Sequence, residues 1–142
     1  MERFTLEHDL PVVCVRAASF PGGVHAAFEK LHALFPADTR RRAYGISHRD
    51  GRGNIIYHAA ATQLHDDEAG RYGLDEAFII RRGTYVGETI TDYMQNLPAI
   101  GRTFERLLAV PELDPAGYCL EEYFSEREMR CSVPVLDQPG RD

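Results

Sequence analysis

The sequence has little cysteine and no long hydrophobic run, and each shortage excludes a class of protein. Its three cysteines, Cys14, Cys119 and Cys131, are an odd number without paired spacing, which argues against the disulfide framework of a small secreted domain. No apolar stretch approaches the roughly 20 residues that a membrane helix needs. The N-terminal residues also lack the basic start and apolar run of a signal peptide. We therefore expect buried thiols and a soluble protein of the reducing cytoplasm.

Basic residues are also fewer than acidic ones. The chain carries 16 basic and 22 acidic residues, a net charge of −6, which disfavours nonspecific binding to a phosphate backbone. The cluster Arg40–Arg42 is the exception, and it is either a solvated loop or a site for an anionic partner. There is no helix-turn-helix segment and no spare length for one, so we expect no direct contact with nucleic acid.

The common catalytic and cofactor motifs are missing. The run Gly45–Arg49 lacks the second glycine of a nucleophile elbow, and a turn rather than a helix follows it. There is no phosphate-binding loop, dinucleotide fingerprint or Cys-x-x-Cys pair, and His25 and His32 are seven residues apart instead of the four of a zinc protease. A metal site formed by His48, His58 and His65 stays open, but partly exposed histidines are the ordinary interpretation. We expect no cofactor and no metal.

The first half of the chain has the pattern of a β-α-β-β unit. An apolar run over Leu10–Ser19 predicts a strand, and apolar residues at three- and four-residue steps from Val24 predict a helix that ends before Pro36. Arg42–His48 and Asn54–Thr62 read as a hairpin, because Asp50 and Gly51 between them form a strong turn signal.

The same pattern begins again after a polar connection at about residues 63–73. It comprises strands at Glu76–Arg82 and Thr84–Thr89, a short turn at Thr91–Asn96 capped by Thr91 and Asp92, a helix that begins around Asn96 and Pro98 and ends at Pro111, and a hairpin of Gly117–Phe124 and Glu128–Val135. A polar tail at 137–142 should fray.

Short segments of the two halves resemble each other. The matching pairs are Val15–Phe20 with Ile80–Tyr85, Phe28–Leu31 with Phe104–Leu107, and Tyr44–Ser47 with Tyr118–Glu121. Chance similarity is one explanation, and a duplicated unit is the more economical one. We therefore predict a single α+β domain of two pseudo-repeats, about 4–62 and 74–136, that form antiparallel sheet with two main helices and a central groove.

The strand Gly117–Phe124 carries two adjacent carboxylates among aromatic residues. Because side chains alternate across a strand, Cys119, Glu121 and Tyr123 should share one face, whereas Glu122 should lie on the other. A glutamate framed by tyrosine can hold an organic cation or position a proton. The plainer alternative is that the tyrosines are ordinary strand residues and both glutamates point to solvent.

A set of short segments occurs together with the duplication: Phe20–Gly22, Phe28–Leu31, Tyr44–Ser47, Ile56–Ala60, Tyr72–Leu74, the strand Ile80–Tyr85 and the run Gly117–Tyr123. Taken together, these segments resemble the GyrI-like small-molecule-binding domain, the effector-binding domain of bacterial transcription activators of the AraC and MerR types, which also occurs alone. The resemblance covers about residues 4–136.

The resemblance implies a pocket glutamate and tyrosine on the penultimate strand, which fall on Glu121 and Tyr123, with Tyr57 and Tyr85 as pocket walls. Two features depart from the family: the chain has no tryptophan, which disfavours stacking of a large flat ligand, and Pro134 suits an edge strand.

Three functions follow from the resemblance. The first is a standalone protein that binds a small cationic or aromatic molecule through Glu121, with Tyr123, Tyr57, Tyr85 and Cys119 beside it. The second is a hydrolase of cyclopropane-bearing electrophiles, in which Glu121 and Tyr123 are catalytic. The third is a protein partner that regulates DNA gyrase.

Overall fold

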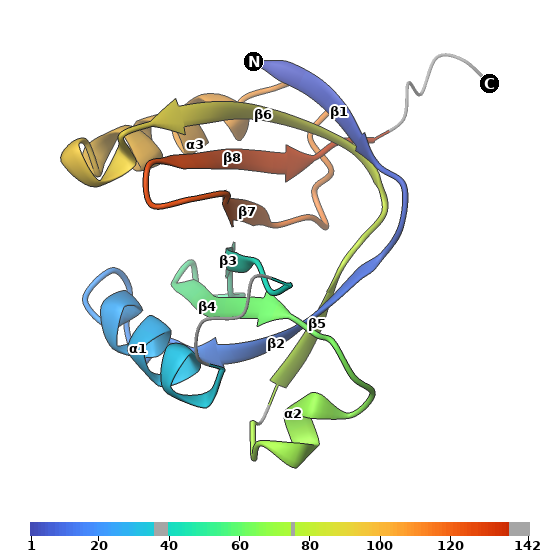
Figure 1. The fold of residues 1–142 in the computed structure, drawn as a ribbon. Helices are drawn as coiled ribbons and strands as arrows, with labels where there is room; N and C mark the ends of the chain where they lie inside the picture. The colour runs from blue at the N-terminus through green and yellow to red at the C-terminus, as the bar shows by residue number, and fades with distance from the viewer. Residues whose placement is uncertain (36–39, 75, 137–142) are drawn as a thin grey trace. The chain divides into compact units, whose positions relative to one another are not determined.

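The computed structural model describes residues 1–35, 40–74 and 76–136. Figure 1 shows the elements along the chain, which are β1 (Glu2–Leu6), β2 (Leu10–Arg16), α1 (Val24–Leu34), β3 (Ala43–Arg49), β4 (Ile55–Thr62), α2 (Glu68–Arg71), β5 (Glu76–Ile80), β6 (Gly83–Thr91), the 3-10 turn η1 (Tyr93–Gln95), α3 (Pro98–Leu107), β7 (Cys119–Tyr123) and β8 (Glu128–Pro134). The predicted tail at 137–142 and the expected stop at Pro36 lie outside the described residues. The α+β class and the two main helices are confirmed.

The chain divides into two compact units. One, which we call the α1 unit, is Asp9–Arg81. The other, the α3 unit, combines Met1–His8 with Arg82–Asp142. Every strand pairing within either unit is antiparallel among the described ladders.

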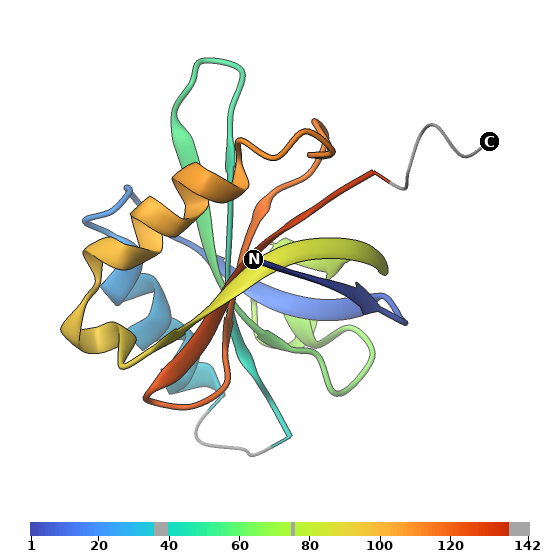
Figure 2. The same cartoon turned by 90° about the horizontal axis from the view of Figure 1, so that it is seen from above.

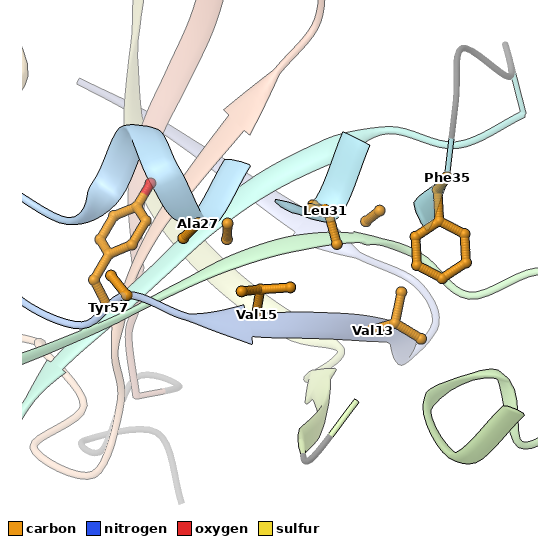
Figure 3. Close-up of a cluster of buried hydrophobic side chains, with 9 residues drawn as sticks. Val13, Val15, Ala27, Leu31, Phe35 and Tyr57 are labelled. Atoms are coloured by element: carbon orange, nitrogen blue, oxygen red, sulfur yellow. The ribbon is translucent and has the colours of Figure 1, made fainter. Parts of the chain in front are cut away.

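The α1 unit has the strand order β3-β4-β2-β5, and α1 covers one face of this sheet. That face carries Val13 and Val15 of β2, and β4 adds the small side chains of Ala59 and Ala61, which leave room for the helix. Figure 3 shows Ala27 and Leu31 of α1 above the two valines. The unit therefore has its own hydrophobic core.

The α3 unit has the strand order β1-β6-β8-β7, and α3 packs on β6 and β8. Figure 2 shows this helix from above. The core under the helix is formed by Val86, Tyr93, Leu107, Met129, Cys131, Val133 and Val135. On the opposite face, Gly87 leaves room for the ring of Phe4, since a Cβ at this glycine would lie 3.2 Å from Phe4 Cε1 and 2.7 Å from the carbonyl oxygen of Cys131.

Several sequence predictions differ from the structure. Glu2–Leu6 forms β1, a strand that the sequence did not suggest and that pairs with β6 across about eighty residues. The expectation that Pro134 marks an edge strand is wrong, because β8 lies between β6 and β7. The proline is tolerated because it is the last residue of β8.

The helix boundaries also differ. The N-cap of α3 is Leu97 instead of Asn96, with Pro98 at the first helical position, and the helix ends at Leu107, before Pro111. The side chain of Asp92 makes no capping hydrogen bond to η1. It forms an ion pair with Arg127 at 2.9 Å instead.

The connection predicted at residues 63–73 contains α2 and a buried ion pair. The Glu68 side chain is 1% exposed, and Arg41 Nη1 and Nη2 donate to its two carboxylate oxygens at 3.0 and 2.7 Å. The backbone N–H of Leu64 also donates to Glu68, at 2.6 Å. One arginine of the Arg40–Arg42 cluster is therefore a structural cation.

We predict that Glu68→Gln destabilises the protein by about 3 kcal/mol near pH 7, because it removes one partner of a buried pair. The Arg41 guanidinium lowers the pKa of Glu68 from an ordinary 4.5 to about 2. Because the folded-state pKa is the lower one, the stabilisation is present above pH 4.5 and is lost as the pH falls toward 2. Urea unfolding at several pH values measures both effects.

The exposed Glu105 of α3 provides the matched control. Glu105→Gln should change the free energy of unfolding by less than about 0.5 kcal/mol. If the two variants are equally stable, the Arg41 contact does not carry the stability assigned to it.

Candidate functional site

The two adjacent glutamates of β7 lie on opposite faces of the sheet. Along β7, Leu120 and Glu122 are buried, whereas Cys119, Glu121 and Tyr123 are half-buried. The ladder pairs Glu121 with Cys131 and Tyr123 with Met129. Since Met129 and Cys131 belong to the core under α3, the half-buried residues of β7 lie on the α3 side.

Glu121 is held by its neighbour on the same face. The Tyr123 hydroxyl donates a hydrogen bond to Glu121 Oε1 at 2.7 Å. This contact follows from the alternation of the strand, which places residues i and i+2 side by side. The carboxylate therefore has a fixed orientation while it keeps part of its surface exposed.

A second tyrosine stands beside this pair. The ring of Tyr93, from η1, contacts the Tyr123 ring edge to face, with centroids 5.5 Å apart. Its hydroxyl donates to the carbonyl oxygen of Ser125 at 3.2 Å. Burial and the negative charge of Glu126 raise the pKa of Tyr93, so this ring is a neutral aromatic wall. The sequence pattern does not place Tyr93 beside Glu121, because the two residues lie on separate elements, η1 and β7.

Glu121 belongs to a row of three residues on neighbouring strands. Cys131 of β8 pairs with Glu121 on one side and with Glu88 of β6 on the other. Burial raises the pKa of the Cys131 thiol, and the charges of Glu121, Cys119 and Glu88 add to the effect. Two carboxylates therefore flank a neutral thiol on the α3 side of the sheet.

Glu122 has a structural environment on the other face. Its side chain is 3% exposed, and Arg130 Nη2 lies 2.8 Å from Glu122 Oε1. The same guanidinium lies 3.6 Å from the centroid of Phe4 and 5.4 Å from that of Phe124. The alternative in which both glutamates point to solvent is wrong, because Glu122 is buried.

The other two predicted site residues belong to other strands, Tyr85 to β6 and Tyr57 to β4. Tyr85 pairs with Pro134 in the ladder, lies on the face opposite Glu121, and shares a hydrogen bond of 2.5 Å between its hydroxyl and that of Tyr118. Tyr57 belongs to the α1 unit, where it is 2% exposed and stacks on Phe20 with centroids 5.7 Å apart. Of the five predicted residues, the α3 side of β7 brings together Cys119, Glu121 and Tyr123.

The histidines considered as metal ligands have other contacts. His58 forms an ion pair with Glu76, and the rings of His48 and His58 stack with centroids 6.4 Å apart. Within residues 1–35, 40–74 and 76–136, no group of three or more His, Cys, Asp or Glu side chains has the arrangement of a metal site. In the same residues, no helix is long and apolar enough to span a membrane.

Solved structures with a similar fold exist, although no protein-family model and no curated protein matches this chain. An integron cassette protein from the mobile metagenome of Vibrio cholerae has a TM-score of 0.69 at 15% identity, with 95% of each chain covered. SAV2435, solved bound to tetraphenylphosphonium, has a TM-score of 0.64 at 12% identity and covers 99% of this chain and 96% of its own.

A hydrolase from Listeria innocua is similar at a TM-score of 0.54 and 10% identity, with 95% of this chain and 90% of that chain covered. At these identities the likeness concerns the fold alone. The fold is thus found in a protein that binds an organic cation and in a protein described as a hydrolase.

The contrast between the two glutamates predicts different effects on stability. Glu122→Gln should lower the free energy of unfolding by about 3 kcal/mol, because it removes the buried carboxylate at 2.8 Å and leaves the Arg130 charge beside the more exposed Glu2 at 3.9 Å. Glu121→Gln should change it by less than about 1 kcal/mol, because the Tyr123 hydroxyl can donate to an amide oxygen as well. Urea unfolding of both variants checks the difference, and equal losses would contradict the assignment of faces.

Proposed function

We propose that this protein binds a small organic cation on the α3 side of β7, with Glu121 as the charged anchor. The observation that carries the proposal is the half-buried Glu121 carboxylate, which a 2.7 Å hydrogen bond from Tyr123 holds in place among aromatic side chains. A carboxylate in partly desolvated surroundings attracts a cation more strongly than one in bulk water.

The aromatic neighbours support a cationic ligand. Tyr93 and Tyr123 contact each other edge to face, beside Glu121. Ring faces carry partial negative charge and attract cations, by about 0.5–2 kcal/mol each. Without tryptophan, we expect the site to favour a compact or propeller-shaped cation over a large flat one.

The structural neighbours provide independent support. SAV2435 shares the fold over nearly the whole chain, and its ligand, tetraphenylphosphonium, is a compact aromatic cation. The agreement between that ligand class and the chemistry around Glu121 favours a binding protein. In the effector-binding domains that the sequence resembles, such a ligand is the signal for transcription regulation, and this role stays part of the proposal.

We predict that Glu121→Gln weakens the binding of tetraphenylphosphonium at least about tenfold, because it removes about 1.4 kcal/mol or more of charge attraction. Isothermal titration calorimetry measures the effect. Glu122→Gln is the matched control, since it changes the same residue type one position away, on the opposite face. It should change the affinity less than threefold, about 0.65 kcal/mol, at a temperature where circular dichroism shows it folded.

Uncharged triphenylphosphine oxide tests whether charge, and not only shape, is recognised. It should bind the wild-type protein more weakly than tetraphenylphosphonium does. Its own affinity should be the same for the wild-type protein and for Glu121→Gln. Equal losses in the two glutamine variants would overturn Glu121 as the anchor.

A hydrolase is the second candidate, favoured by the hydrolase from Listeria innocua among the similar structures. In this account Glu121 would activate a water molecule and the Tyr123 hydroxyl would donate a proton, within the 2.7 Å pair that the structure contains. Mass spectrometry of a cyclopropane-bearing electrophile incubated with the protein decides between the two. Ring opening that is lost in Glu121→Gln supports the enzyme, and binding without product supports the binding protein.

A further inference from the structure

The second carboxylate of the site row, Glu88, already has a cation from the protein itself. Arg106 of α3 donates to Glu88 Oε2 from Nη2 at 3.0 Å and from Nε at 3.3 Å. Nη2 also lies 3.3 Å from the hydroxyl of Thr103, one turn earlier on the helix and 3% exposed. The Glu88 carboxylate and the Thr103 hydroxyl therefore hold the guanidinium at the end of the row that is farther from Glu121.

Glu88 and Glu121 are close enough to act on the same ligand. Both flank Cys131 in the ladder, so their strands are separated by two spacings of about 4.8 Å each. Both residues lie on the α3 side of the sheet, and the charges of both raise the pKa of the Cys131 thiol between them. A ligand with two cationic groups on a short arm would span this distance.

Solvent can reach both members of the ion pair. The Glu88 side chain is 25% exposed and that of Arg106 is 54% exposed. An ion pair at such exposure contributes about 0.2–1 kcal/mol to stability, so it stabilises the packing of α3 on the sheet only weakly. Its larger effect is electrostatic, because the Arg106 guanidinium places a positive charge beside one of the two carboxylates of the row.

We propose that Arg106 acts as a built-in competing cation that occupies Glu88 and so makes the Glu121 site select singly charged ligands over doubly charged ones. This inference rests on the proposed function, because it concerns the ligand class of the same site. The positive charge of Arg106 repels the second charge of a dication while Glu121 receives the first. Arg106 is a specificity-determining residue that acts through Glu88.

A structural role for the pair makes a different prediction. If Arg106 only stabilises the packing of α3, its replacement weakens the binding of all ligands equally, whatever their charge. If it sets the charge preference, its loss changes the ratio of affinities for a monocation and a dication that share one aromatic core. Propyltriphenylphosphonium and (3-trimethylammoniopropyl)triphenylphosphonium are such a pair, since the second adds a quaternary ammonium at the end of the propyl arm.

The experiment compares the dissociation constants of the two phosphonium ions, measured by isothermal titration calorimetry, for the wild-type protein and for Arg106→Gln. We expect the preference to move toward the dication about tenfold, or about 1.4 kcal/mol, in Arg106→Gln. The double variant Glu88→Gln with Arg106→Gln should return the ratio to the wild-type value, because the second carboxylate is then gone as well. Thermal unfolding confirms that each variant is folded.

Arg102→Gln is the matched control. Arg102 lies one turn earlier on the same exposed helix surface and contacts Asn96 at 3.5 Å. It removes the same charge from the same helix without touching Glu88, so the ratio should stay at the wild-type value. An equal shift in Arg102→Gln and Arg106→Gln would overturn the inference in favour of a general charge effect.

The outcomes separate this inference from the proposed function. If the ratio is unchanged in Arg106→Gln while Glu121→Gln abolishes binding of the monocation, the charge selection is wrong and the cation site stands. If neither phosphonium binds the wild-type protein, or Glu121→Gln leaves binding of the monocation unchanged, the proposed site is wrong and the inference fails with it.

Discussion

The alternation of side chains along β7 is the constraint on which the account of this protein depends. Two consecutive glutamates cannot lie on one face of a strand, so the backbone assigns them different environments. One face meets Arg130, Phe4 and the interior, where a charge must be paired. The other meets the edge of the α3 layer, where Glu121 stays half-buried. A one-residue shift of register would exchange the two roles.

The pairing of charges extends through the molecule. Glu68 with Arg41 and Glu122 with Arg130 are buried acids, each held by a guanidinium, and both belong to the scaffold. Glu88 with Arg106 repeats the pairing in a partly exposed place. Glu121 accepts a hydrogen bond from a tyrosine hydroxyl and is half-buried.

Local patterns could be predicted from the sequence, whereas contacts between distant strands could not. The two main helices and the faces of β7 follow from periodicities of 3.6 and 2 within short segments, and the turn at Asp50–Gly51 follows from its residue types. The strand β1 has no such signal, because its pairing with β6 supplies the reason for it to be a strand. Alternation within Thr84–Thr89 also cannot reveal that the side chains of Tyr85 and Glu121 lie on different faces of the sheet. That requires the register between β6, β8 and β7. The similarity between Val15–Phe20 and Ile80–Tyr85 does not mark corresponding strands either. Val15 lies in β2, whereas Ile80 ends β5 and Tyr85 lies in β6.

A crystal structure of the protein with tetraphenylphosphonium tests the central claim most directly. The account predicts the phosphonium on the α3 side of β7, with a phenyl ring against Tyr93 or Tyr123 and the phosphorus about 4–6 Å from the Glu121 carboxylate, the distance over which an opposite charge acts strongly. A cation bound away from Glu121, for example on the face that carries Glu122 and Tyr85, would contradict it.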